Sequence, residues 1–404
     1  MMLKWLSNSN RGEAPSASPE KGRDTLYLHS EGRHEEAAAA CRELIALNPL
    51  DVRAHEVLGC ALASLGDAAG AATAFGSALR IDPAFVHAHC NRGLSLLSLG
   101  DYAGGWEEFE WRWKRPELQT LRNMFPGSWW DGSDLSGRTI LLFAEQGFGD
   151  AIQFVRYASI VSKAGARVVV DCHPPLKALL RQVRGVTHVL EDDAEIPRYK
   201  LYCPLMSLPR LLATRPDSIP ADVPYITPTK DCVDHWRGKV APAGETMRIG
   251  LVWASNPATG YAWHKSVPLE LFAPLGSIDG LRLYSLQTGL PAEHVAQLPP
   301  GLQLIDLSDG LRDFSDTAGF ISNLDLVISV DTAVAHLAAA MGKTTWTLLP
   351  KVADWRWGAQ GDATLWYPTM RLFRQQIAGD WSGVIARVGA QLRVLADGDR
   401  ARRD

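Results

Sequence analysis

The sequence predicts an α + α/β protein in which helical repeats are followed by two doubly wound α/β domains. Glycines and prolines recur at intervals of 34 residues in the first third, and apolar runs alternate with amphipathic stretches in the remainder. The expected parts are a disordered polar tail (1–23), repeats (24–117), a linker (118–137) and two α/β domains (138–228 and 247–395).

The composition is that of a globular protein with 404 residues, of which 46% are hydrophobic and 21% charged. A formal net charge of −4 gives no basic field, so no nucleic-acid partner is expected. The six cysteines form no C-x-x-C pair. The chain also has neither a secretory h-region nor an apolar run of membrane-spanning length. We therefore expect a cytoplasmic protein without a membrane span.

Two sets of residues share the 34-residue interval: the glycines Gly32, Gly66 and Gly100 and the prolines Pro49 and Pro83. This is the period of the tetratricopeptide repeat, a pair of helices in which small residues permit close packing. The third repeat differs, because it is rich in tryptophan and carries Arg112 where a small residue is usual. Such repeats could recruit a partner or dock on the rest of their own chain, and the sequence leaves both open.

The first α/β domain contains a βαβ unit. An apolar run (140–144), the loop "EQGFGD", a helical stretch (151–164) and a β-branched run (167–170) follow one another. In such sheets ligands bind at the carboxyl ends of the strands, which directs attention to the loop. Its glycines favour a dinucleotide site only weakly, since the third glycine of that motif is absent. Asp150, at the predicted helix start, could act as an acid or base, or could simply cap the helix.

The second α/β domain opens with "MRIGLVWASNP" and continues through four further strand-like runs. The loop after the first run carries Ser255 and Lys265 before a helix start, and the loop "LQTG" carries Gln287. A lysine beside a helix start suits a phosphate, because the ammonium and the backbone N–H groups both favour an anion. An ordinary solvated surface lysine is the alternative.

The segment "LDLVISVDTAVAHLAAAMGK" predicts a buried strand over 326–330 and a helix over 333–341. Asp331 or Thr332 would be the N-cap, and the small residues that follow would leave the helix N–H groups accessible to a phosphate. We expect the carboxylate of Asp331 to be aimed at a hydroxyl or at those N–H groups. His336, one turn into the helix, is either a buried core residue or a ligand contact.

The motif "GDAIQF", the lysine loop and "DLVISVDTAVAHLAAAMGK" together resemble the heptosyltransferase-like glycosyltransferases of family 9, over roughly Arg138 to Val394. The whole arrangement is similar to bacterial proteins in which such a transferase follows tetratricopeptide repeats. The resemblance implies a GT-B fold of two Rossmann-like domains. The N-terminal one would lie on the acceptor side, and the C-terminal one would bind the nucleotide-sugar donor.

The resemblance also implies roles for individual residues. Asp150 would be the general base, and Lys265 would hold the donor phosphates. The donor-binding helix start would comprise Asp331, Thr332, Ala333 and Val334, with His336 nearby. Where Ala333 stands, the family usually has glycine. Ser255 and Gln287 are further donor-side candidates; possible sugar or acceptor contacts are Gly147, Gly149, Gln153, Trp355 and Trp357. The tryptophans of "DWRW" could stack on a sugar or could belong to the core.

The resemblance thus implies a metal-independent inverting glycosyltransferase that uses a nucleotide-diphosphate sugar, a hydroxyl acceptor and no cofactor. One carboxylate would serve as the base, while a lysine and a helix N-terminus would neutralise the diphosphate. No D-x-D motif appears where a metal-dependent transferase would need one. Two alternatives stay open: an O-glycosyltransferase whose repeats present a protein acceptor, and a catalytically inactive repeat scaffold. The partners would be the donor and a protein or glycan acceptor.

Overall fold

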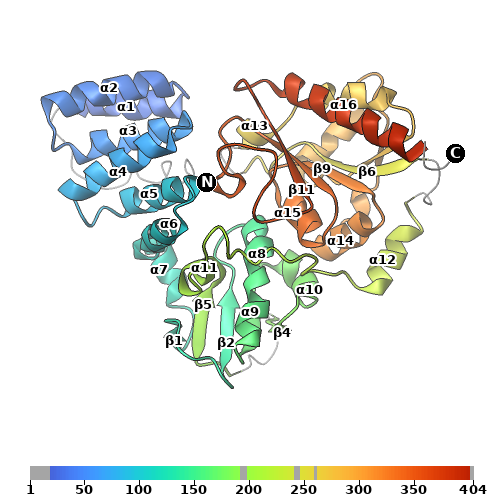
Figure 1. The fold of residues 1–404 in the computed structure, drawn as a ribbon, viewed down its shortest axis with the longest axis horizontal. Helices are drawn as coiled ribbons and strands as arrows, with labels where there is room; N and C mark the ends of the chain where they lie inside the picture. The colour runs from blue at the N-terminus through green and yellow to red at the C-terminus, as the bar shows by residue number, and fades with distance from the viewer. Residues whose placement is uncertain (1–18, 192–197, 241–245, 259–261, 401–404) are drawn as a thin grey trace. The chain divides into compact units, whose positions relative to one another are not determined.

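The computed structural model describes residues 19–191, 198–240, 246–258 and 262–400 (Figure 1). Its contacts divide the chain into two compact units. Unit 1 comprises the residues up to Pro126 together with Pro209–Ile219 and Val352–Gly361, and unit 2 comprises the rest. Residues 1–18 of the expected tail lie outside the described residues, and the first helix begins at Pro19. Within the described part of the chain, no helix is long and apolar enough to span a membrane.

Unit 1 is built from pairs of helices: α1 (Pro19–Ser30) with α2 (His34–Leu47), α3 (Val52–Ser64) with α4 (Ala68–Ile81), and α5 (Val86–Ser98) with α6 (Tyr102–Phe109). A 3-10 helix η2 (Glu110–Lys114) and α7 (Pro116–Arg122) follow. Gly32, Gly66 and Gly100 form the turns within the pairs, at φ angles of 77°, 86° and 84° that favour glycine. The prediction of helical repeats is confirmed.

The helices of a pair approach closely because glycine stands at the contact. A Cβ atom on Gly59 would lie 2.6 Å from the ring of Phe75, and one on Gly93 would lie 2.8 Å from the backbone nitrogen of Phe109. Both phenylalanines are fully buried. A larger residue at either glycine would therefore force the paired helices apart.

A buried histidine makes the stability of the repeats sensitive to pH. His29 is 3% exposed, and its Nδ1 lies 3.1 Å from Nδ1 of His34. Burial, and then the neighbouring His34, lower the pKa of His29 to about 4. Between pH 6.5 and 4 the unfolded chain therefore binds the proton more readily than the folded chain, so stability is lost as the pH falls through this window.

Lowering the pH from 7 to 4.5 should reduce the free energy of unfolding of the wild type, and we expect His29→Gln to make this reduction smaller by about 2–3 kcal/mol. The measurement is urea unfolding of both proteins at pH 7 and pH 4.5, compared as the change in the free energy of unfolding between the two pH values. An equal change in wild type and variant would show that His29 does not carry the effect.

Unit 2 contains two parallel sheets, one of five strands in the order β1-β5-β2-β3-β4 and one of six in the order β11-β10-β9-β6-β7-β8. The first sheet comprises β1 (Ser128–Trp129), β2 (Thr139–Phe143), β3 (Arg167–Asp171), β4 (Val186–Val189) and β5 (Leu201–Pro204). The second comprises β6 (Met247–Val252), β7 (Leu281–Ser285), β8 (Leu304–Asp306), β9 (Leu326–Val330), β10 (Thr345–Leu349) and β11 (Met370–Arg374). The predicted pair of doubly wound domains is confirmed, and the segment expected as a linker supplies β1.

Helices follow the strands of both sheets. They are α8 (Phe148–Phe154), α9 (Ala158–Lys163), α10 (Lys177–Leu180), α11 (Leu208–Leu211), α12 (Lys230–Arg237), α13 (Ala262–Lys265), α14 (Phe314–Ser322), α15 (Ala333–Ala340) and α16 (Trp381–Arg400). The 3-10 turns are η3 (Val155–Tyr157), η4 (Pro174–Leu176), η5 (Leu205–Ser207), η6 (Leu269–Ser277), η7 (Leu290–Gln297), η8 (Ser308–Gly310) and η9 (Trp355–Trp357). The helix expected over 151–164 is thus two shorter helices joined by η3.

The segment after β10 packs within unit 1. In the turn η9 the ring of Trp355 lies 5.2 Å from that of Trp106 and 6.3 Å from that of Tyr102, both nearly perpendicular. Trp355 is 4% exposed and Trp357 is 1% exposed. The burial of both rings favours the alternative that these two tryptophans belong to the core over contact with a sugar or acceptor. The repeats therefore do dock on a segment of their own chain.

Candidate active site

The start of α8 positions Asp150. The helix has Gly147 at its N-cap, and the Gly147 N–H donates to Oδ2 of Asp150 at 3.1 Å. Asp150 is thus the third residue of the helix rather than the N-cap. The carboxylate is half-buried and lies in the first turn, where the helix dipole favours a negative charge. An acid or base at this position would be held in one orientation.

The first turn of α8 lies directly against the first turn of α15. A Cβ atom on Gly149 would be 2.9 Å from Cδ2 of His336 and 3.6 Å from Cα of Ala333. Because α8 follows β2 and α15 follows β9, the carboxyl ends of the two sheets meet at this contact (Figure 1). Glycine at position 149 is explained by the approach of His336, which leaves no room for a side chain.

The N-cap residue of α15 does not cap the helix with its own side chain. Thr332 is the N-cap residue, yet its side chain makes no capping hydrogen bond, and its hydroxyl lies 3.0 Å from that of Ser329. Ala333 and Val334 are half-buried. A helix start of this kind can receive an anion on its first N–H groups.

Asp331 forms an ion pair with Lys265, whose Nζ lies 2.5 Å from Oδ2 of the carboxylate. The ammonium of the lysine loop was not among the partners expected for this carboxylate, which were a hydroxyl or the helix N–H groups. The Ser255 hydroxyl donates to the carbonyl of Asp331 at 3.4 Å. The structure therefore brings together three of the predicted donor-side residues. Trp263, also on α13, is 68% exposed.

Gln287 uses its side-chain amide on the backbone. Its Oε1 accepts from the N–H groups of Trp253 and Ala254 at 3.2 and 2.9 Å, and its Nε2 donates to the carbonyls of Ala254 and Thr288 at 3.2 and 3.1 Å. The side chain is 4% exposed. The side chain of Gln287 thus fixes the loop after β6, which is a structural role and not the expected contact with the donor.

His336 and Gln153 are both buried. His336 is 5% exposed, and its Nδ1 lies 2.9 Å from the hydroxyl of Tyr367, so the buried alternative holds for this histidine. Gln153 is fully buried because α8 turns it toward the core, a position that does not favour its expected contact with a sugar or acceptor. Gly147 is exposed at the helix start.

Phe148 and His173 also lie near Asp150, although neither was predicted from the sequence. Phe148 is two positions before Asp150 in α8, and His173 contacts the loop that precedes this helix. Phe148 is 38% exposed, and its ring lies 5.2 Å from that of His173 and 5.3 Å from that of Phe314. His173 follows β3, and its Nε2–H donates to the carbonyl of Gln146 at 2.6 Å, which leaves Nδ1 of the neutral ring as an acceptor. A histidine just after the carboxyl end of a strand was the available sequence signal.

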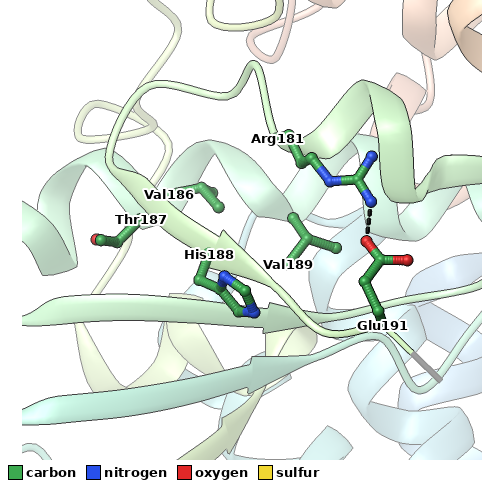
Figure 2. A pocket seen from close by; sticks show the side chains of 6 residues that line it. All are labelled: Arg181, Val186, Thr187, His188, Val189 and Glu191. Atoms are coloured by element: carbon green, nitrogen blue, oxygen red, sulfur yellow. Dashed lines mark ion pairs between the residues drawn. The ribbon is translucent and has the colours of Figure 1, made fainter. Parts of the chain in front are cut away.

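Two pockets in unit 2 lie apart from Asp150 and Lys265. One, of about 360 Å³, lies along β4, with an ion pair of Arg181 and Glu191 at its wall (Figure 2). Another, of about 280 Å³, lies between α10 and α14. Neither is lined by Asp150 or Lys265. In the described ranges no group of three or more histidine, cysteine, aspartate or glutamate side chains is arranged to hold a metal ion.

Two family models match the chain. A tetratricopeptide repeat model matches residues 27–84 and 58–109, and the model of glycosyltransferase family 9 (heptosyltransferase) matches residues 291–363. Residues 27–109 thus match tetratricopeptide repeats, and the segment that matches the family 9 model contains the start of α15. The suspected resemblance is confirmed, and these matches support a glycosyltransferase.

A curated relative and two solved structures are similar over much of the chain. Protein FlbA of Caulobacter vibrioides is 25% identical over 322 residues, which cover 72% of this chain and 52% of FlbA. The chain therefore spans about half the length of this relative.

A glycosyl transferase family 9 structure from Veillonella parvula has a TM-score of 0.50 at 11% identity and covers 67% of this chain and 99% of its own. The ADP-heptose lps heptosyltransferase II of E. coli has a TM-score of 0.46 at 13% identity, with 65% and 99% covered. The first of these likenesses concerns the fold. Together with the two sheets it confirms a GT-B arrangement of two Rossmann-like domains, and the helix pairs with the repeat model confirm the helical repeats that precede it.

Proposed function

We propose that the chain transfers a sugar from a nucleotide-diphosphate sugar to a hydroxyl acceptor, with inversion at the anomeric carbon and without a metal ion. The observation that carries this proposal is the contact between the starts of α8 and α15 at Gly149 and His336. This contact brings α8, which follows a strand of the first sheet and carries Asp150, against the start of α15. That start follows a strand of the second sheet and lies beside the ammonium of Lys265. Acid–base chemistry and phosphate binding would then share one site.

On the acceptor side Asp150 would take the proton of the attacking hydroxyl. The Gly147 N–H donates to one carboxylate oxygen of Asp150 and so orients the carboxylate at the start of α8. Direct attack on the anomeric carbon, opposite the leaving diphosphate, inverts that centre in a single displacement. Phe148 and His173 would form the adjoining acceptor surface, one by ring contact and the other by accepting a hydrogen bond at Nδ1.

On the donor side Lys265 and the first N–H groups of α15 would stabilise the charge that develops on the leaving diphosphate. Asp331 holds the ammonium at this helix start. A bound diphosphate would share the ammonium with the carboxylate of Asp331. The hydroxyl of Ser255 and the backbone of Thr332, Ala333 and Val334 would complete the phosphate contacts. Gln287 would act indirectly, by holding the loop that leads to Ser255.

Donor binding can be tested by thermal unfolding in the presence of a panel of nucleoside diphosphates and nucleotide sugars. A ligand at 100 times its Kd stabilises the folded protein by about 2.7 kcal/mol, so a bound donor should raise the melting temperature. Lys265→Met should remove most of that rise. Lys230→Met, at a lysine that is 86% exposed on α12, should retain it. A panel in which no compound shifts the transition would contradict the proposal.

A protein acceptor is the second candidate, favoured by the tetratricopeptide match over residues 27–109. Such repeats commonly present a surface to a polypeptide, in addition to the contact with the segment after β10. Mass spectrometry of acceptor mixtures with the full chain distinguishes the candidates. Sugar added to polypeptides would favour this acceptor class, and sugar added only to glycans would exclude it.

A further inference from the structure

Arg156 is a buried cation at the junction of three segments of unit 2. It lies in the turn η3 and is 2% exposed. Its Nε donates to the carbonyl of Gln153 at 2.8 Å, its Nη1 to those of Pro220 and Trp366 at 3.2 and 2.7 Å, and its Nη2 to the Tyr225 hydroxyl at 3.0 Å. Each of these acceptors is neutral.

Three aromatic rings surround the same guanidinium. Its central carbon lies 4.8 Å from the ring of Tyr225, 5.4 Å from that of Trp366 and 4.6 Å from that of Tyr367. Cation–π attraction offsets part of the cost of removing the charge from water. A hydrophobic residue of similar size often serves a core equally well or better. The guanidinium instead provides five N–H donors in a fixed plane. Two of the carbonyls that it binds, those of Pro220 and Trp366, belong to neither a helix nor a strand.

The partners of Arg156 reach both helices of the candidate active site. The Tyr225 hydroxyl donates to the carbonyl of Ile152 in α8 at 3.0 Å, and the Tyr225 backbone N–H donates to the carbonyl of Ala340, the last residue of α15, at 3.0 Å. The Tyr367 hydroxyl lies 2.9 Å from Nδ1 of His336, whose ring adjoins Gly149. Two separate chains of contact thus join Arg156 to α8 and α15.

We propose that Arg156, acting through Tyr225 and Tyr367, is a positioning residue that fixes α8 against α15 and so sets the distance from the Asp150 carboxylate to the donor. This inference rests on the proposed glycosyl transfer. Arg156 itself touches neither substrate. Its removal should therefore slow the chemical step while leaving donor binding at Lys265 and the α15 helix start intact, because those groups lie within one domain.

The test uses Arg156→Lys, which keeps the charge but loses the planar fork, and Tyr367→Phe, which loses only the hydroxyl that meets His336. In the full chain both variants should lower kcat on the order of 10- to 100-fold, as expected for a displaced catalytic group, with the KM for the donor within about twofold. Tyr284→Phe is the matched control, because Tyr284 is a buried tyrosine of β7 in ring contact with Phe320. Unchanged kcat in both variants would overturn the proposal.

Hydrogen exchange of the backbone amides gives a readout that does not require turnover. Arg156→Lys and Tyr367→Phe should each speed exchange in α8 and in α15, whereas Tyr284→Phe should speed exchange in neither. Faster exchange confined to η3 and α9, with exchange in α8 and α15 unchanged, would overturn the proposal, since it would show a purely local packing role. If wild-type protein transfers no sugar, the proposed function fails by its own assay, and the exchange experiment still decides whether Arg156 couples the two helices.

Discussion

Replacing Asp150 with asparagine is expected to lower turnover by about 10²- to 10⁴-fold, the usual contribution of a general base. The asparagine oxygen can still accept the hydrogen bond from the Gly147 N–H, so the start of α8 should keep its conformation. What is lost is the capacity to take a proton from the acceptor hydroxyl. The affinity for the donor should not change, because the groups proposed to bind the donor belong to α13 and α15.

The measurement is steady-state turnover together with the thermal shift produced by the donor. Asp231→Asn is the matched control, since Asp231 is an exposed carboxylate in the first turn of another helix, α12. It should leave both quantities unchanged. Near wild-type turnover by Asp150→Asn would remove Asp150 from the role of base.

Replacing Trp355 with alanine is expected to destabilise unit 1 by about 3–5 kcal/mol, the usual cost of truncating a buried tryptophan. The ring is 4% exposed and meets Trp106 and Tyr102 edge to face, with the guanidinium of Arg356 4.8 Å from its centre. The alanine would leave a cavity lined by these groups and would release the segment after β10 from the repeats.

Two separate measurements check this expectation. Chemical unfolding of the full chain gives the loss of stability, and limited proteolysis of the folded protein shows whether the segment is released. Cleavage should appear within residues 352–361 of the variant under conditions in which the wild type resists. Val352→Ala is the control from the same segment, because Val352 is 40% exposed and should cost little. Unchanged stability and cleavage in Trp355→Ala would show that the segment does not hold to the repeats.

The elements with strong local patterns were predictable from the sequence. The 34-residue interval of Gly32, Gly66 and Gly100 predicted the helix pairs, because each glycine occupies a turn with positive φ. The runs around β2 and β9 predicted strands, since both are almost entirely buried. The helix over 151–164 was predicted as one element, and the structure interrupts it where the buried Arg156 lies in a 3-10 turn.

Side-chain partners that are distant in the sequence could not be predicted. Asp331 pairs with Lys265, 66 positions earlier, and no local pattern indicates that meeting. Gln287 lay in the loop where a ligand contact was expected, but the backbone of the neighbouring loop takes up its amide. Trp355 followed a strand of the second sheet, as a ligand contact would. Its burial depends on helices α5 and α6, some 250 residues earlier, whose packing surface the sequence of the loop does not reveal.

We propose that the helix carrying Asp150 and the helix start beside Lys265 form one glycosyl-transfer site. Its most direct test is to incubate the full chain with the nucleotide sugar that gives the largest thermal shift and with a mixture of hydroxyl acceptors, then to measure release of the nucleoside diphosphate and the configuration of the product. We predict release that depends on the acceptor, a product of inverted configuration, and loss of both with Asp150→Asn. A bound donor that yields no product with any acceptor, or equal product from Asp150→Asn, would show that these two helix starts do not form such a site.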